Sequence, residues 1–192
     1  MSDRAAGVLK GSRTMAKRLS TRTKLSAGIL AHRRADDVIE VLLVHPGGPF
    51  WRNKEDGAWS IPKGEIGATE DPEAAARREF NEELGPSATV GPLRSLGEVV
   101  QRGGKHVMAF AGEGDFDPGK LASNSFEIEW PPRSGRMQAF PEVDRAEWYD
   151  LKTAKTKILS GQVDLLDRLE EVLPDPRRPN TLKGKPRAAK PG

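Results

Sequence analysis

Three glutamates crowd one turn of a predicted helix within the segment GEIGATEDPEAAARREFNEELGP, residues 64–86. Glu79, Glu82 and Glu83 are related as i, i+3 and i+4, so on an α-helix their side chains share one face. Like charges at this spacing repel one another. Because clustered carboxylate oxygens are the ligands that Mg²⁺ and Mn²⁺ prefer, the turn predicts a site for a divalent cation.

The ends of this helix are also marked in the sequence. Asp71 is the expected N-cap, Pro72 suits the first helical position, and Gly85 suits the stop. A neighbouring apolar face, spaced by four residues, would anchor the helix; it consists of Ala76, Phe80 and Leu84. The helix should therefore bury one side and present its carboxylates on another.

The spacing of the whole segment resembles the Nudix box. The residues in register with that pattern are Gly64, Glu70, Arg78, Glu79, Phe80, Glu82, Glu83 and Gly85. The one departure is Pro86, where an apolar residue is usual. The alternative is a solvated helix face on which Arg77 and Arg78 pair with the glutamates, and the full pattern outweighs it.

The resemblance covers about residues 23–169 and implies an α/β fold, an α/β/α sandwich around a mixed β-sheet. Apolar and β-branched runs between turn signals agree with such a fold. Strands are expected at 25–32, 38–44, 93–101, 105–111, 126–130 and 146–151, and a second helix within 152–173. Residues 45–60 are expected to form a long loop, and the single strand at 126–130 interrupts a Gly/Pro-rich stretch.

Length and charge predict one domain between two arms. The chain has 192 residues, enough for a single core, and we expect a Nudix domain at 23–173. The segments 1–22 and 174–192 are basic, although the net charge is only +3, so the centre is acidic. Disordered, solubilising arms are expected, and weak contact with nucleic acid or a membrane surface is the alternative.

Two absences narrow the class of protein. The chain contains no cysteine, which excludes disulfides and thiolate chemistry. It has neither a long apolar run nor a secretory leader. A cytoplasmic protein with no membrane contact is therefore expected.

The resemblance implies hydrolysis of a nucleoside diphosphate linked to another group, with water attacking phosphorus and Mg²⁺, or Mn²⁺, as cofactor. The implied metal ligands are Glu79, Glu82, Glu83 and the carbonyl of Gly64. Glu79 would also orient or deprotonate the water. Arg78 and Glu70 would join the box loop to the helix by an ion pair.

Many members of the family add a carboxylate from outside the box, about six residues before a tryptophan in a late strand. Glu142, which precedes Trp148, matches this position. Glu127 and Glu129 are the rivals for the same role. The sequence leaves the choice among the three open.

Residues around the box would contact the substrate. Lys63, directly before the box, is placed to meet a phosphate oxygen, and Arg52 is a weaker candidate. Trp51 or Trp59 could stack on a base, with packing as the alternative role. His45 is a minor candidate for the pocket lining.

The substrate is expected to be a small nucleotide. The segment GAWSIPKGE resembles the entry to the box in dinucleoside tetraphosphate and diphosphoinositol polyphosphate hydrolases, and other segments resemble a bacterial group of predicted NTP pyrophosphohydrolases. An NTP or a dinucleoside polyphosphate is favoured. The alternatives are an RNA 5′-end pyrophosphohydrolase and a non-catalytic, nucleotide-binding regulatory domain, and the oligomeric state is open.

Overall fold

The strand pair predicted near the start of the domain forms the middle of the sheet. The computed structural model describes residues 25–173, and the arms predicted at 1–22 and 174–192 lie outside them. Strands β1 (Leu25–Ala35) and β2 (Val38–Pro46) pair in antiparallel fashion. Asp36 and Asp37 connect them with positive φ angles of 45° and 67°. Two such residues form the turn that suits a twisted hairpin.

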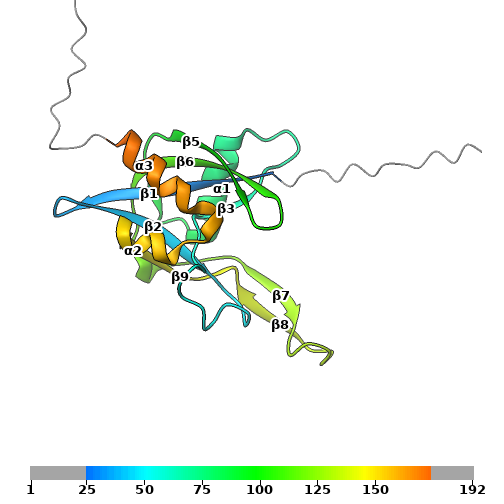
Figure 1. Cartoon of the computed structure of the whole chain (residues 1–192). Coiled ribbons are helices and arrows are strands. Elements are labelled where there is room, and N and C mark those ends of the chain that lie inside the picture. The colour runs from blue at the N-terminus through cyan, green and yellow to red at the C-terminus, as the bar shows by residue number, and fades with distance from the viewer. Residues whose placement is uncertain (1–24, 174–192) are drawn as a thin grey trace, which may run out of the picture.

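The main sheet has seven strands and mixed directions (Figure 1). Its order is β4-β6-β1-β2-β9, with β3 paired to β1 and β5 paired to β6. The bounds of the further strands are β3 Lys63–Glu65, β4 Thr89–Val90, β5 Arg94–Gln101, β6 Lys105–Asp115 and β9 Val143–Asp150. Because β1 and β6 run parallel while the other pairs are antiparallel, the predicted mixed sheet is confirmed.

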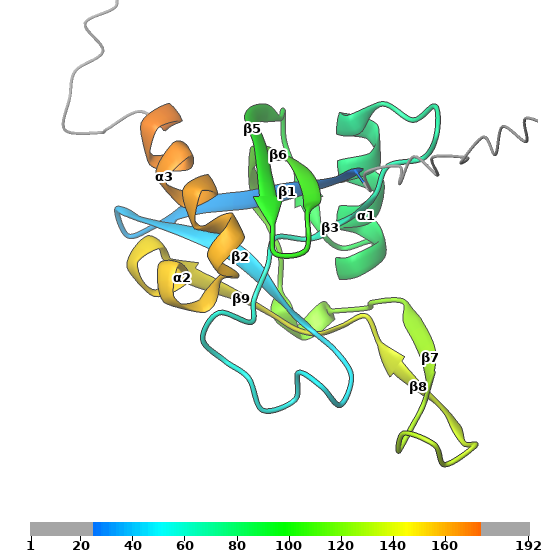
Figure 2. The same ribbon diagram turned by 45° about the vertical axis from the view of Figure 1, so that its right-hand side comes forward.

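Helices cover both faces of this sheet, as Figure 2 shows. Their bounds are α1 Pro72–Leu84, α2 Leu151–Lys157 and α3 Val163–Val172, with short 3₁₀ turns η1 at Pro118–Lys120 and η2 at Ser160–Gln162. Side chains alternate across β2, since Leu42 and Val44 join the core under α1 whereas Val41 and Leu43 join the core under α2 and α3. The α/β/α sandwich is confirmed.

Helix α1 begins and ends where the sequence predicts. The Asp71 side chain accepts hydrogen bonds from the backbone N–H groups of Glu73 at 3.0 Å and Ala74 at 3.1 Å. Gly85 ends the helix with φ of 96°, which a residue with a Cβ rarely adopts. The buried residues of the helix are Ala75, Ala76, Phe80 and Leu84, so its carboxylates are held on a rigid element.

The region 152–173 contains two helices, not the single one that the sequence predicts. Between them Ile158 has extended backbone angles, φ −71° and ψ 148°. The backbone of buried Trp59 lies beside this break: its N–H donates to Lys157 O at 3.0 Å, and its carbonyl accepts from Leu159 N at 2.8 Å. Buried backbone groups need partners, and the interrupted helix supplies them.

The region after β6 contains two strands where the sequence predicts one. β7 (Ser125–Glu129) and β8 (Met137–Pro141) form a separate two-stranded sheet that projects from the body (Figure 1). β9 then begins at Val143, earlier than predicted, so Glu142 lies directly before a core strand. Within residues 25–173, no helix is long and apolar enough to cross a membrane.

We predict that Asp71→Ala lowers the free energy of unfolding by about 1 kcal/mol, the usual cost of losing an N-cap. Two N–H groups of the first turn would lose their acceptor. Chemical denaturation of the full chain measures the change. Ser87→Ala, at an exposed position just past the helix, is the control, and equal stability of the two variants would contradict the capping role.

Candidate active site

The carboxylate of Glu79 lies directly over the backbone of Gly64. A Cβ built on Gly64 would lie 1.9 Å from both the carboxyl carbon and Oε2 of Glu79. Gly64 itself is fixed because β3 pairs with β1, opposite Ala27. Only glycine leaves room for this contact, which brings the Glu79 carboxylate against the backbone of Gly64, another predicted metal ligand.

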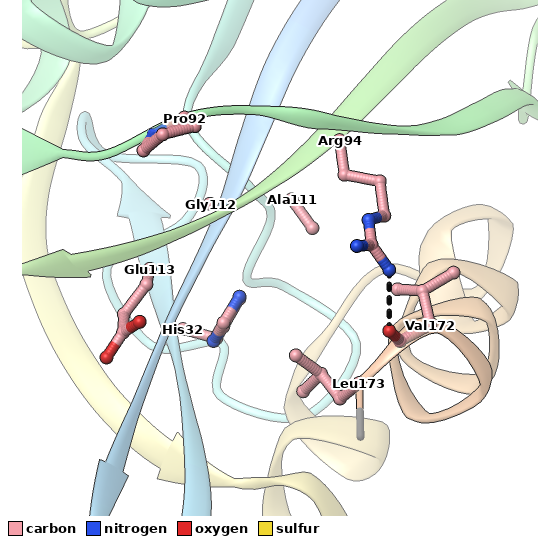
Figure 3. A pocket seen from close by; sticks show the side chains of 8 residues that line it. All are labelled: His32, Pro92, Arg94, Ala111, Gly112, Glu113, Val172 and Leu173. Carbon is pink, nitrogen blue, oxygen red and sulfur yellow. Dashed lines mark hydrogen bonds between the residues drawn. The ribbon is translucent and has the colours of Figure 1, made fainter. Parts of the chain in front are cut away.

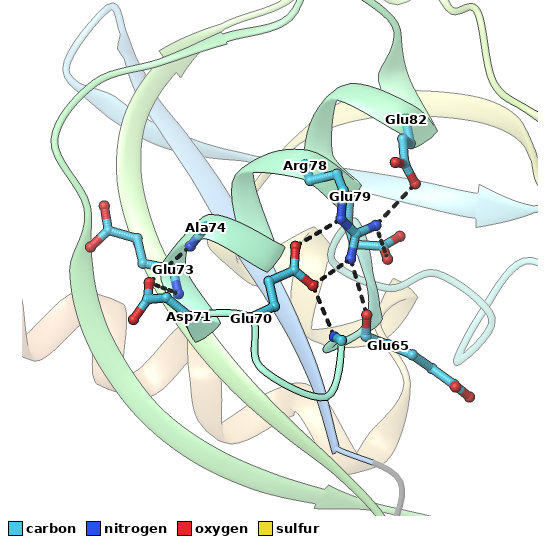
Figure 4. A network of polar contacts seen from close by, with 9 residues as sticks. Glu65, Glu70, Asp71, Glu73, Ala74, Arg78, Glu79 and Glu82 are labelled. Carbon is cyan, nitrogen blue, oxygen red and sulfur yellow. Dashed lines mark hydrogen bonds and ion pairs between the residues drawn. The ribbon is translucent and has the colours of Figure 1, made fainter.

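The guanidinium of Arg78 binds three carboxylates at once (Figure 4). Its Nε and Nη2 donate to the two oxygens of Glu70 at 2.9 and 3.0 Å. Its Nη1 donates to Glu79 at 2.7 Å and to Glu82 at 3.2 Å. A further bond from Nη2 reaches the backbone carbonyl of Glu65 at 3.1 Å. Arg78 thus ties the loop to the helix and offsets the repulsion among the glutamates.

The ion pair with Arg78 changes the acidity of both partners. Hydrogen bonds from Arg78, together with one from the Gly67 N–H at 2.9 Å, lower the pKa of Glu70 to about 2. The same contact with Glu70 raises the pKa of Arg78. Glu70 is therefore ionised throughout the neutral and mildly acidic range, so the bridge persists there.

Glu83 occupies a different environment from its two neighbours. Burial raises the pKa of its carboxyl to about 7, and the nearby positive charge of Lys63 opposes this rise. The backbone N–H of Lys63 also donates to Glu83 Oε2 at 3.3 Å. Lys63 belongs to strand β3, and its pairing with Gly28 of β1 fixes its backbone.

Glu142 approaches the box from the far end of the chain. Its negative charge, with that of Glu79, contributes to the raised pKa of Glu83. Two backbone bonds hold Glu142 in place: its N–H donates to Asn124 O at 2.8 Å, and its carbonyl accepts from Gly47 N at 2.9 Å. The rivals Glu127 and Glu129 lie on the projecting strand β7, where both are exposed.

The chemistry of the donors fits a hard divalent cation, because the Glu79 carboxylate lies against the Gly64 backbone and the buried carboxyl of Glu83 is near it. Among residues 25–173, however, no three acidic or histidine side chains stand close enough together to hold a metal as they are placed. Arg78 accounts for this arrangement, since it binds Glu79 and Glu82 itself. The carboxylates of Glu79 and Glu82 therefore face the guanidinium of Arg78.

The two tryptophans predicted to stack on a base both pack against the core on the side of α2 and α3. Trp59 is fully buried in the core under α2 and α3, where it packs edge-on against His45 and Tyr149. It has no open ring face, so the alternative role of packing holds for Trp59. Trp51 is partly buried against the same core, with the Lys54 ammonium 4.5 Å from its ring centroid. The structure therefore brings neither ring to the carboxylates of α1.

Of the remaining candidates, Arg52 is exposed on the loop beside Trp51. His45 is fully buried, and both ring nitrogens are engaged, Nδ1 with Asp144 at 2.6 Å and Nε2 with Lys54 O at 2.8 Å. His45 therefore fastens the loop that follows β2 and does not line a pocket.

Two hollows lie near or beyond this site. One, of about 510 Å³, is an open depression beside Glu82, lined by Arg78, Asn81, Glu82 and Pro86. The other, of about 220 Å³, lies between β1, β5, β6 and the end of α3 (Figure 3). In the second hollow burial lowers the pKa of His32, and Arg94 donates to Val172 O at 2.8 Å. No carboxylate of the box lines this second hollow.

The segment that positions Glu142 is not predicted from the sequence. Ser123 Oγ accepts from Val143 N at 3.1 Å, and Ala122 N donates to Leu84 O at the end of α1 at 3.1 Å. These bonds depend on the β7–β8 hairpin folding back on itself. The available signal is the turn-forming run at residues 131–135, two prolines, Arg, Ser and Gly, between two stretches that contain aromatic residues.

Comparison with known families identifies the domain. The family model described as the NUDIX domain matches residues 22–169. The chain belongs to the Nudix family. With every carboxylate of its box present, this Nudix protein is a hydrolase of the nucleotide pyrophosphohydrolase class.

The chain is similar to solved Nudix structures at low sequence identity. A NUDIX hydrolase from Nitrosomonas europaea is 18% identical, with a TM-score of 0.51 over 78% of this chain and 90% of that one. An Ap4A hydrolase from C. elegans, in a binary complex, is 23% identical, with a TM-score of 0.48 over 77% of this chain and 96% of that one. The search of curated proteins finds no match.

We predict that Gly64→Ala lowers kcat/KM by roughly 100-fold, because the new methyl group must displace the Glu79 carboxylate. The fold should survive, since the displaced atoms are the end of a flexible side chain. Steady-state kinetics and thermal melting test both statements. Gly91→Ala, whose nearest neighbour would be a backbone oxygen at 3.4 Å, is the control. Activity equal to that of the control would contradict the close contact.

Glu70 should make the Nudix domain sensitive to acid. A carboxyl whose pKa falls from 4.5 to about 2 on folding stabilises the protein above pH 4.5, and this contribution is lost as the pH falls toward 2. We predict that Glu70→Gln has a lower free energy of unfolding at pH 6 and a shallower loss below pH 4.5. Urea titrations across pH 2–6 measure the two slopes, and identical slopes would rule out the bridge.

Proposed function

We propose that this Nudix hydrolase cleaves the pyrophosphate linkage of an NTP or a dinucleoside polyphosphate in a Mg²⁺-dependent reaction. The observation that carries the proposal is that Glu79, Glu82 and Glu83 lie on one turn of α1, with the Glu79 carboxylate against the backbone of Gly64. A cytoplasmic location and a small nucleotide as the only obligatory partner belong to the same proposal.

The residues at the site would have different roles in binding the cation and the substrate. Glu79, Glu82, Glu83 and the Gly64 carbonyl would hold Mg²⁺, or Mn²⁺, and Glu142 would complete the set. When bound, the cation neutralises phosphate charge and lowers the pKa of water. The family-like spacing and the proximity of Glu142 to Glu83 support this assignment.

Proton transfer and phosphate binding would fall to two neighbours. Glu79 lies between Gly64 and Arg78, where its free oxygen can orient a water or accept its proton. Lys63 carries its charge close to Glu83 and can meet a phosphate oxygen there. Arg78 would keep the helix and loop aligned through Glu70 while the cation takes over Glu79 and Glu82.

The two alternatives differ in what they require. An RNA 5′-end pyrophosphohydrolase rests on the basic arms, which lie outside the described residues. A regulatory, non-catalytic domain would not need all of the box carboxylates, and this chain retains them. A small nucleotide substrate needs only the groups that the described domain brings together.

We predict that Glu82→Gln lowers Mg²⁺-dependent turnover at least 100-fold across a panel of NTPs and dinucleoside polyphosphates, since it removes a ligand charge. Product masses identify the bond that is cleaved. Glu171→Gln, on the exposed end of α3, is the matched control and should behave as the unmodified chain. Unchanged turnover in Glu82→Gln would contradict catalysis at this site, and binding without hydrolysis across the panel would favour the regulatory alternative.

A further inference from the structure

The β7–β8 hairpin forms a sheet separate from the main one, and nothing in the proposed reaction uses its two strands. It projects away from the main sheet (Figure 2) and, within residues 25–173, pairs with no other strand. An isolated two-stranded hairpin is only marginally stable in water. Contacts outside the two strands must therefore hold the projecting hairpin in its position.

The anchor lies at the active site. Ala122, which leads into the hairpin, donates to the last carbonyl of α1, and Asn124 accepts from the N–H of Glu142. Glu142 follows β8 directly, and its charge acts on Glu83. The base of the hairpin is thus continuous with the edge of the carboxylate site.

Aromatic side chains extend from this base along one face of the hairpin. The pairing register places Phe126 opposite Phe140, with ring centroids 6.3 Å apart. Farther out, Trp130 packs edge-on against Phe50 of the preceding loop at 5.3 Å. Residues 126 and 130 are four apart, so the outer pair lies about 13 Å farther along the strand.

The outer pair, Phe50 and Trp130, has two properties that packing does not require. Phe50 is 59% exposed although it packs against Trp130, so it is one of the few large apolar side chains within residues 25–173 that meet solvent. The adjoining turn carries Arg133 and Arg136, both exposed, and neither has an ion-pair partner among residues 25–173. Open rings beside free guanidinium groups suit a nucleotide, which offers a base to stack and phosphates to pair.

We infer that the outer pair binds the second nucleoside of a dinucleoside polyphosphate whose scissile pyrophosphate lies at Glu79 and Glu83. The inference rests on the proposed function and narrows it to substrates with two bases. A mononucleotide held at the carboxylates would have no second base to place on the outer pair. The outer pair would then discriminate between substrates through binding, with no part in the chemical step.

The test compares diadenosine tetraphosphate with ATP on the full chain in Mg²⁺. Trp130→Ala and Phe50→Ala should each raise the KM for diadenosine tetraphosphate relative to that for ATP by about tenfold, with little change in kcat. Trp130→Phe, which keeps a ring, should restore most of the ratio. Val100→Ala, 54% exposed on β5, is the control for loss of an exposed apolar side chain.

A second readout does not depend on turnover. In Glu82→Gln, titration with diadenosine tetraphosphate should quench tryptophan fluorescence, and Glu82→Gln combined with Trp130→Phe should lose most of that quenching. Equal KM ratios in all hairpin variants, with quenching unaffected, would overturn the inference. So would a change of oligomeric state in Trp130→Ala at an unchanged KM ratio, because the outer pair would then be a contact between two copies of the chain.

Turnover by the unmodified chain tests the proposed function separately from the hairpin site. No turnover of any nucleotide with Mg²⁺ would contradict the function and this inference with it. Turnover that depends on Glu82, together with an unchanged KM ratio, would contradict the hairpin site alone.

Discussion

The contact between Arg78 and the carboxylates around it governs the arrangement of the whole site. Three glutamates on one helical turn repel one another, and the repulsion is lowest when a positive charge lies among them. In the structure the guanidinium supplies that charge, with bonds of 2.7 and 3.2 Å to Glu79 and Glu82. The same group fixes the loop through Glu70, so the box is held in shape before any cation or substrate arrives.

Strand β3, helix α1 and the segment around Glu142 hold the residues of this contact in place. Gly64 gives Glu79 room only because β3 is fixed against β1, and α1 is fixed because Phe80 and Leu84 are buried under it. Glu142 reaches the site from the other end of the domain, held by backbone bonds to Asn124 and Gly47. The Glu79–Glu83 turn therefore depends on contacts between segments that are far apart in the sequence.

Local signals made the helix and the strand pairs predictable, whereas features set by distant contacts were not. Asp71, Pro72 and Gly85 act within their own turn of chain, so α1 follows from the sequence alone. The break at Ile158 exists to pair the backbone of Trp59, a partner that apolar periodicity in 152–173 does not reveal. For the same reason Trp59 could not be assigned to the core or to the substrate until its surroundings were known.

The central claim is that the Glu79–Glu83 turn takes a divalent cation in place of Arg78. Titration of the full chain with Mn²⁺, followed by the loss of the free-ion electron paramagnetic resonance signal, tests it most directly. The account predicts Mn²⁺ binding that Mg²⁺ competes away and that Glu79→Gln and Glu83→Gln each weaken strongly, whereas Glu171→Gln leaves it unchanged. Equal Mn²⁺ binding in all three variants would contradict the account.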